Sequence, residues 1–172
     1  MSVKKGMLLD TNIWLNAYIP ERDGAGTCRA IIENCLKNKV PIYFAITSLK
    51  DVFYVLERNM KKHLVEAAFQ STDGSSATPA QSESIPYIAH EYAWSIVDTM
   101  CQIGTPVAMD MSDTWIAQHL RSDHEDLEDN LVIAACMRAD AGYLVTADKE
   151  LKMNSRIATL LPHQALAVLE LA

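Results

Sequence analysis

The residues with the clearest chemical potential in this sequence are four aspartates that stand beside apolar runs. Asp10, Asp51 and Asp148 each come at or shortly after the end of a short apolar run, and Asp129 opens a longer one. If these carboxylates meet in the folded chain, they repel and raise one another's pKa values unless a cation neutralises them. Oxygen ligands without histidine or cysteine favour Mg²⁺ or Mn²⁺ over zinc. The acids therefore predict a divalent-metal site suited to phosphodiester hydrolysis, because such a metal activates water and stabilises charge on the reacting oxygens.

Each acid also has a structural interpretation, in which Asp129 favours a helix N-terminus and Asp148 caps a helix after a strand. Rival chemistry is absent from the sequence, which contains no P-loop, no G-x-G-x-x-G and no G-x-S-x-G motif. A phosphatase with Asp10 as its nucleophile is a weaker alternative, because the expected Asp-x-Asp pattern is Asp-Thr-Asn here. The four cysteines and five histidines show no metal-ligand spacing, so we interpret the cysteines as reduced core residues.

Residues 126–150 show how the chain can position two of these acids. The apolar run after Asp129 contains leucine, alanines and methionine, which favour a helix over a strand. Gly142 stands where a helix C-terminus usually places a left-handed residue. The next segment, YLVT, is β-branched and aromatic, which is typical of a buried strand. This pattern places Asp129 in the first turn of a helix and Asp148 just beyond the C-terminal end of a strand.

Strands and helices are predicted to alternate along the rest of the chain. The predicted strands are residues 3–9, 41–46, 105–109, 143–146 and 156–160. Because helices separate them, the pattern predicts an α/β fold, a three-layer α/β/α sandwich around a parallel sheet of about five strands. Asp51 is expected in the first turn of the helix after the second strand. In parallel sheets such strand ends converge on one edge, so the acids are expected to meet there.

The length of 172 residues predicts a single domain over residues 1–172. Residues 70–83 (QSTDGSSATPAQSE) are poor in large apolar side chains and predict a flexible loop, followed by a helix at residues 84–103. No apolar stretch reaches membrane-spanning length and no signal peptide is visible, so we expect a cytoplasmic protein without a membrane partner. The net charge of −7 argues against broad binding to a polyanion and suits a basic partner protein.

Four segments carry a family resemblance. They are LLDTNIWL at residues 8–15, TSLKDVFYVLER at 47–58, DLEDNLVIAACMRADAGYLVTADKEL at 126–151 and IATLLPHQAL at 157–166. Together they resemble the PIN-domain family, in particular the single-domain ribonuclease toxins of bacterial toxin–antitoxin pairs. The L-x-D-T-N opening and the L-V-T-x-D ending are fairly specific when they occur together.

The resemblance implies a PIN-like fold, dependence on Mg²⁺ or Mn²⁺, and hydrolysis of single-stranded or structured RNA. The catalytic carboxylates that it implies are Asp10, Asp51, Asp129 and Asp148. Those expected to bind the metal directly are Asp10, Asp129 and Asp148. The residues expected to orient these acids or their waters, or to add an acid beside them, are Thr11, Asn12, Thr146 and Asp126. The family more often has glutamate at position 51, so the shorter Asp51 can act through a bridging water.

Two functions of different classes remain open at this stage. The first is a metal-dependent endoribonuclease that cleaves RNA, is inhibited by a cognate antitoxin protein and forms a homodimer. The alternative is a catalytically silent PIN-like module that binds a protein or RNA, which Asp51 and the net charge of −7 favour. Basic side chains that flank the motifs and could meet phosphates are Lys50, Arg58, Lys61, Lys62, Arg138 and Lys149. We interpret Trp14 and Tyr54 as core residues rather than as platforms for base stacking.

Overall fold

The computed structural model describes residues 5–71 and 79–171. Five short strands form one sheet in the order β3-β2-β1-β4-β5, and every neighbouring pair is parallel. The strands are β1 (Met7–Leu9), β2 (Ile42–Ala45), β3 (Thr105–Val107), β4 (Tyr143–Val145) and β5 (Thr159–Leu160). The predicted parallel sheet of about five strands is therefore confirmed.

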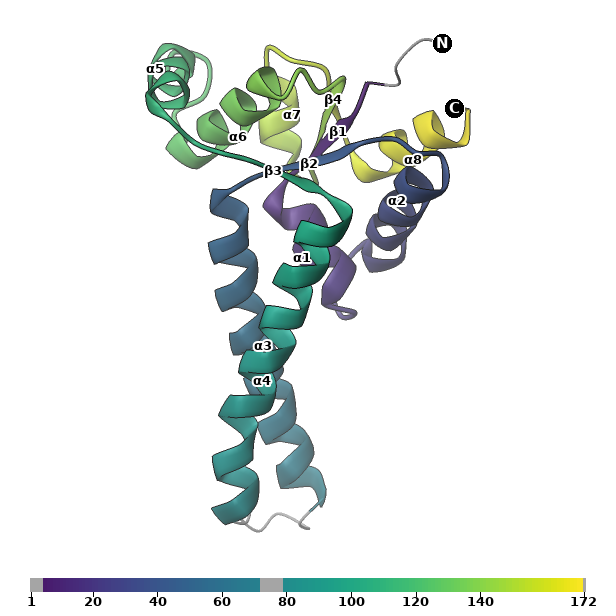
Figure 1. The fold of residues 1–172 in the computed structure, drawn as a ribbon, viewed down its shortest axis with the longest axis vertical. Coiled ribbons are helices and arrows are strands. Elements are labelled where there is room, and N and C mark those ends of the chain that lie inside the picture. Colours follow the sequence, from purple (N-terminus) through teal and green to yellow (C-terminus); the bar gives the residue numbers. More distant parts are fainter. Residues whose placement is uncertain (1–4, 72–78, 172) are drawn as a thin grey trace.

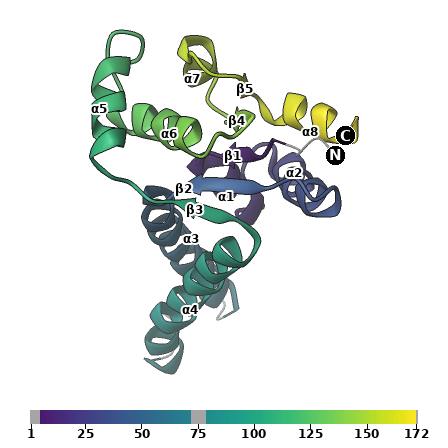
Figure 2. The same ribbon diagram turned by 45° about the horizontal axis from the view of Figure 1, so that its top comes forward.

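Helices surround this sheet. They are α1 (Thr11–Tyr18), α2 (Ala25–Lys37), α3 (Thr47–Ser71), α4 (Pro79–Ile103), α5 (Met111–Leu120), α6 (Leu127–Arg138), α7 (Lys149–Asn154) and α8 (Pro162–Glu170). Figure 1 shows α3 and α4 as a long hairpin that projects away from the sheet, and Figure 2 shows α5, α6 and α7 grouped on the other side. In the described part of the chain, no helix combines the length and apolar character that crossing a bilayer requires.

Both faces of the sheet are buried, because successive strand residues point into two different cores. Met7 and Leu9 of β1 pack with buried side chains of α1, α2, α3, α4 and α8. Leu8, between them, packs with buried side chains of α5, α6 and α7. This alternation produces the three-layer α/β/α arrangement that the sequence predicts.

The direction of the strand order reverses at β1. The chain moves from β1 through β2 to β3 on one side, then returns to place β4 and β5 on the other side of β1. In open parallel sheets, ligands bind beyond the carboxyl ends of the strands at such a switch point. Asp10 directly follows β1, and Asp148 closely follows β4. The fold thus brings two of the predicted acids to the position where a site is expected.

Several predicted boundaries differ from the structure. The strands β2, β3, β4 and β5 are shorter than their predicted ranges, and β1 begins at Met7. Residues 3 and 4 of the first predicted strand lie outside the described residues. Helix α4 begins at Pro79 rather than at residue 84, which fits the preference of proline for the first turn of a helix. The predicted loop at residues 70–83 overlaps both hairpin helices, and its middle, residues 72–78, lies outside the described residues.

Gly142 does not adopt the left-handed conformation that the sequence suggests. The positive φ after α6 belongs to Asp140, at 46°, a conformation that aspartate tolerates better than most residues. Gly142 is instead required by a close approach, since a Cβ there would lie 2.6 Å from Cβ of Lys5. Its N–H also donates to the carbonyl of Gly6 at 2.8 Å. The missing side chain therefore lets the start of β4 lie against the segment that leads into β1.

Candidate active site

Asp10 is the buried centre of the site. Its N–H donates to the carbonyl of Val145 at 3.0 Å, which holds the end of β1 beside β4. One carboxylate oxygen, Oδ1, accepts from the N–H of Thr11 at 2.6 Å. The other, Oδ2, accepts from Asn12 Nδ2 at 2.6 Å and Thr146 Oγ1 at 2.7 Å. Burial raises the pKa of Asp10 above its ordinary value, although these hydrogen bonds act in the opposite direction.

Asn12 and Thr146 tie the ends of β1 and β4 together. Asn12 Oδ1 accepts from the N–H of Ala147 at 2.8 Å, and its Nδ2 donates to Thr146 Oγ1 at 3.0 Å. The same threonine hydroxyl accepts from the N–H of Asp148 at 3.0 Å. The two side chains thus connect the segments that carry Asp10 and Asp148, and they fix the orientation of the Asp10 carboxylate.

Thr11 contributes to the site through its backbone. Its N–H reaches Asp10, whereas its hydroxyl donates to Ser48 Oγ at 2.8 Å and so links α1 to the first turn of α3. Ser48 is buried. This contact fixes the N-terminus of α3 relative to the end of β1.

Asp129 lies in the first turn of α6, where the sequence places it. Asp126 is the N-cap of this helix, and its Oδ1 accepts from the N–H groups of Glu128 at 2.8 Å and Asp129 at 3.2 Å. Burial, followed by the charge of Asp10, raises the pKa of Asp129 to about 6. Asp126 and Asp148 push this pKa in the same direction. Asp10, Asp126 and Asp148 are therefore close enough to Asp129 to oppose its ionisation.

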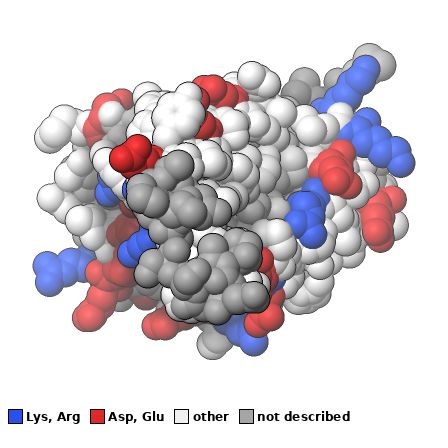
Figure 3. Space-filling model, turned by 90° about the horizontal axis from the view of Figure 1, so that it is seen from below, with Lys and Arg blue, Asp and Glu red and all other residues white. Residues whose placement is uncertain are grey.

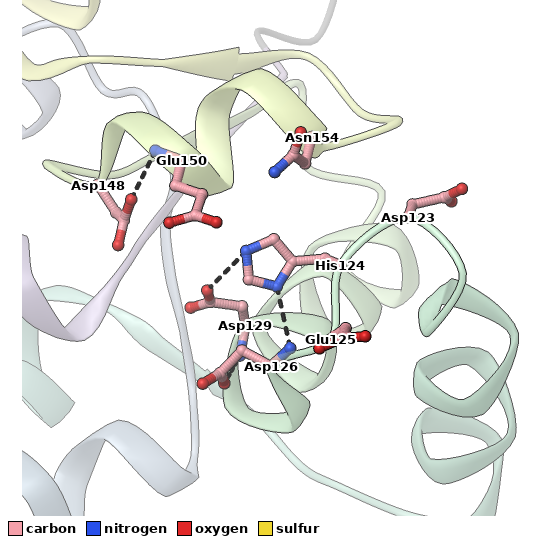
Figure 4. Close-up of a pocket in the computed structure, with 8 residues that line it drawn as sticks. All are labelled: Asp123, His124, Glu125, Asp126, Asp129, Asp148, Glu150 and Asn154. Atoms are coloured by element: carbon pink, nitrogen blue, oxygen red, sulfur yellow. Dashed lines mark hydrogen bonds and ion pairs between the residues drawn. The ribbon is translucent and has the colours of Figure 1, made fainter.

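Asp148 caps α7, because its Oδ1 accepts from the N–H groups of Glu150 at 2.7 Å and Leu151 at 3.1 Å. It also borders a cavity of about 630 Å³. The residues that line this cavity are Asp123, His124, Glu125, Asp126, Asp129, Asp148, Glu150 and Asn154. Figure 4 shows Asp148 and Glu150, from the start of α7, across the cavity from Asp129 and Asp126. Asp148 therefore caps α7 and also lies beside the other acids of the cavity.

Asp51 occupies a different position from the one predicted. It lies in the second turn of α3 rather than the first, because the helix already begins at Thr47. Its Oδ1 is 3.3 Å from Nζ of Lys50, and it is not among the residues that line the acidic cavity. Asp10 and Asp148 lie close enough to Asp129 to raise its pKa, so the structure brings these three predicted acids together.

Two further interpretations from the sequence change. Trp14 is buried against Phe44, as expected, whereas Tyr54 is 61% exposed and is not a core residue. Arg138 is not available to phosphates, because it forms ion pairs with Asp110 and Asp113 and donates to the carbonyl of Ala108.

Several residues at the site are absent from the sequence prediction, among them His124, Glu128 and Glu150. His124 and Glu150 line the cavity, and the charge of Glu128 raises the pKa of Asp10. Glu128 directly precedes Asp129 and Glu150 lies two residues after Asp148, so their positions in the sequence could have indicated them. His124 belongs to no motif, and only the packing of the loop before α6 reveals its place.

The donor chemistry of the site fits a hard divalent cation. Asp10, Asp129 and Asp148 offer only oxygen, and the raised pKa values reflect burial together with unneutralised like charge. Within residues 5–71 and 79–171, however, no three His, Cys, Asp or Glu side chains stand in an arrangement that could hold a metal ion. Both oxygens of Asp10 accept hydrogen bonds, and Oδ1 of Asp148 accepts hydrogen bonds from the first turn of α7.

Comparison with known proteins agrees with this architecture. The sequence model of the PIN domain matches residues 6–150. The fold resembles the crystal structure of VapBC2 from Rickettsia felis bound to a DNA fragment from their promoter, with a TM-score of 0.59 and 16% sequence identity. That similarity covers 90% of this chain and 97% of the other. No curated protein sequence matches the chain significantly.

Proposed function

The chain belongs to the PIN-domain family, and we propose that it is an endoribonuclease that depends on Mg²⁺ or Mn²⁺ and acts as the toxin of a toxin–antitoxin pair. Members of this family are generally nucleases that depend on divalent metal. The observation that carries the proposal is the convergence of Asp10, Asp126 and Asp148 on Asp129, which together with burial raises the pKa of Asp129 to about 6. Such a group of carboxylates lacks a counter-charge, and a divalent cation supplies one.

The ligands that would hold the cation are Asp10, Asp129 and Asp148. When bound, the cation supplies activation of a water molecule and neutralisation of charge at the scissile phosphate. Asn12 and Thr146 keep the carboxylate of Asp10 oriented, because both donate to the same oxygen. Asp51 acts from outside this group, through a bridging water, which is consistent with its position one turn into α3.

The distribution of charge on the protein supports a mode of RNA binding that requires the bound divalent metal ion. The net charge is −7, and the cavity is lined mainly by carboxylates. When the described residues are viewed from the end toward which α3 and α4 project, Lys and Arg side chains are scattered among Asp and Glu (Figure 3). RNA binding on such surfaces cannot rely on a broad positive field, so local contacts and the metal must position the substrate.

A cognate antitoxin is the partner that best suits this surface. The sequence resembles PIN-domain toxins, and the fold of the chain is similar to that of a chain in the VapBC2 crystal structure. The acidic cavity complements a basic segment of a partner protein, which would compete with a divalent cation for the same carboxylates. We include a homodimer in the proposal on the family resemblance alone.

A catalytically silent PIN-like module is the alternative. It is favoured by Asp51 and by the finding that, among the described residues, no three His, Cys, Asp or Glu side chains form a ready-made metal-binding group. Such a module would bind a protein or RNA and would cleave nothing with or without metal.

Mn²⁺ titration by calorimetry, followed by RNA cleavage assays, tests the proposal. The proteins compared are the wild type, Asp10→Asn/Asp148→Asn, and the control Asp23→Asn/Asp98→Asn, which changes the net charge equally at two exposed positions. We expect binding and cleavage in the wild type and the control, and neither in the site variant. Metal binding without RNA cleavage, or no binding in any of the three, would favour the silent module.

A further inference from the structure

We propose that His124 is a positioning residue that holds the carboxylate of Asp129 by a hydrogen bond from its Nε2–H. This inference rests on the proposed function, since it concerns a carboxylate expected to bind the metal. The His124 side chain is 9% exposed, and its Nε2 is 3.3 Å from Oδ2 of Asp129. In Figure 4 the imidazole stands between the acids of α6 and the residues of α7.

The backbone on both sides of His124 is fixed. Its N–H donates to the carbonyl of Leu120 at 3.1 Å, which connects it to the end of α5. Its own carbonyl accepts from Nδ2 of Asn130 at 2.7 Å, and Asn130 is buried in the first turns of α6. The imidazole is therefore placed by two helices and does not depend on a free loop for its position.

A further contact determines which nitrogen of His124 carries the proton. The backbone N–H of Asp126 points at Nδ1 of His124, at 3.2 Å. A backbone N–H can only donate, so Nδ1 must offer its lone pair and Nε2 carries the hydrogen in the neutral ring. Nε2 is the ring nitrogen that lies 3.3 Å from Oδ2 of Asp129. The ring is thus a donor with a fixed direction.

Asp129 needs such a donor because its other neighbours repel it. The charges of Asp10, Asp126 and Asp148 all act against its ionised form. A hydrogen bond on Oδ2 also leaves Oδ1 to serve as the metal-facing oxygen. Partners of metal-binding side chains of this kind typically change metal affinity by about 10- to 100-fold when they are removed.

Two substitutions separate the hydrogen bond from mere packing. His124→Leu fills a similar volume without a donor, whereas His124→Gln places an amide N–H close to the position of Nε2. We expect the leucine variant to bind Mn²⁺ about 10- to 100-fold more weakly and the glutamine variant to recover most of that loss. His163→Leu, at an exposed position of α8, is the matched control and should bind as the wild type does. Unfolding temperatures without metal show that each variant is folded.

Wild-type affinity in His124→Leu would overturn the proposal, and so would an equal loss in the glutamine and leucine variants. Ring ¹⁵N shifts of the metal-free wild type at alkaline pH provide a measurement that needs no metal. We expect a protonated Nε2 and an unprotonated Nδ1, and the opposite tautomer would refute the hydrogen bond to Asp129. If the wild type binds no Mn²⁺, the proposed function fails, whereas the tautomer still decides the role of His124 in holding Asp129.

Discussion

Asp10 and Asp113 are both buried, but they lie among opposite kinds of neighbours. Asp113 belongs to the capping box of α5 and pairs with the guanidinium of Arg138, which also contacts Asp110 at 2.9 Å. Asp10 has only uncharged donors around it, and the carboxylate of Glu128 acts against its ionised form. Burial with a cation partner creates a structural ion pair, while burial beside other acids leaves charge that an external cation can neutralise.

The two regions are similar in local sequence. Asp110 shortly follows β3 and caps α5, just as Asp148 shortly follows β4 and caps α7. The difference is the place of the strand in the sheet: β3 is at an edge, whereas β4 adjoins β1 at the switch point. An acid at a strand end is therefore not by itself a sign of a site.

Removing the cation from the structural pair should have the largest effect. Arg138→Leu leaves Asp113 buried without a counter-charge, and its Oδ1 already has no hydrogen-bond partner among the described residues. We expect a loss of about 3–5 kcal/mol in the free energy of unfolding, measured by urea denaturation. Arg156→Leu, which breaks a more exposed pair with Asp123, should cost less than about 1 kcal/mol. If both variants lost a similar free energy of unfolding, the buried pair would be no more important for stability than the exposed pair.

The pH dependence of stability should reveal the acids that lack a cation. The pKa of Asp129 is raised from 3.8 to about 6 in the folded chain, so its ionised form opposes folding. This penalty is absent below pH 3.8, grows as the pH rises through the interval, and is fully present above about 6. Metal-free wild type should therefore lose stability over this interval, by at most about 3 kcal/mol from this group. Asp129→Asn should lose less, and denaturation curves that shift in parallel for both proteins would contradict the expectation.

Substitutions at the two helix caps should give the smallest change in stability and the sharpest contrast in function. Asp148→Ala removes the cap of α7 and should cost about 1 kcal/mol, whereas Asp148→Asn keeps the cap. Both should weaken Mn²⁺ binding, because both remove the charge. Asp110→Asn, the equivalent change after β3, should leave Mn²⁺ affinity unchanged. Calorimetric titration measures this, and undiminished binding in Asp148→Asn would show that Asp148 serves only as a cap.

The sequence was a sufficient guide wherever local pattern decides the outcome. The short apolar runs predict the five parallel strands, and the positions of Asp10, Asp129 and Asp148 relative to strands and helices agree with the structure. The errors arise where distant contacts decide. Glycine is required at position 142 by the close approach of Lys5, not by a left-handed backbone conformation. Helix α3 begins at Thr47, so Asp51 lies in its second turn instead of its first. Likewise, only the position of Asp113 shows that Arg138 is already paired.

By itself, the sequence determined the alternation of strands and helices and the acids that follow β1 and β4, because backbone propensity and side-chain periodicity act over a few residues. The tertiary structure alone decided which carboxylates are neutralised. Arg138 of α6 reaches Asp113 of α5 because the two helices pack together, and Asn12 bridges to Ala147 because β1 and β4 are neighbours in the sheet. The charge state of a buried acid depends on its distance to groups from other segments, and local sequence does not specify those distances.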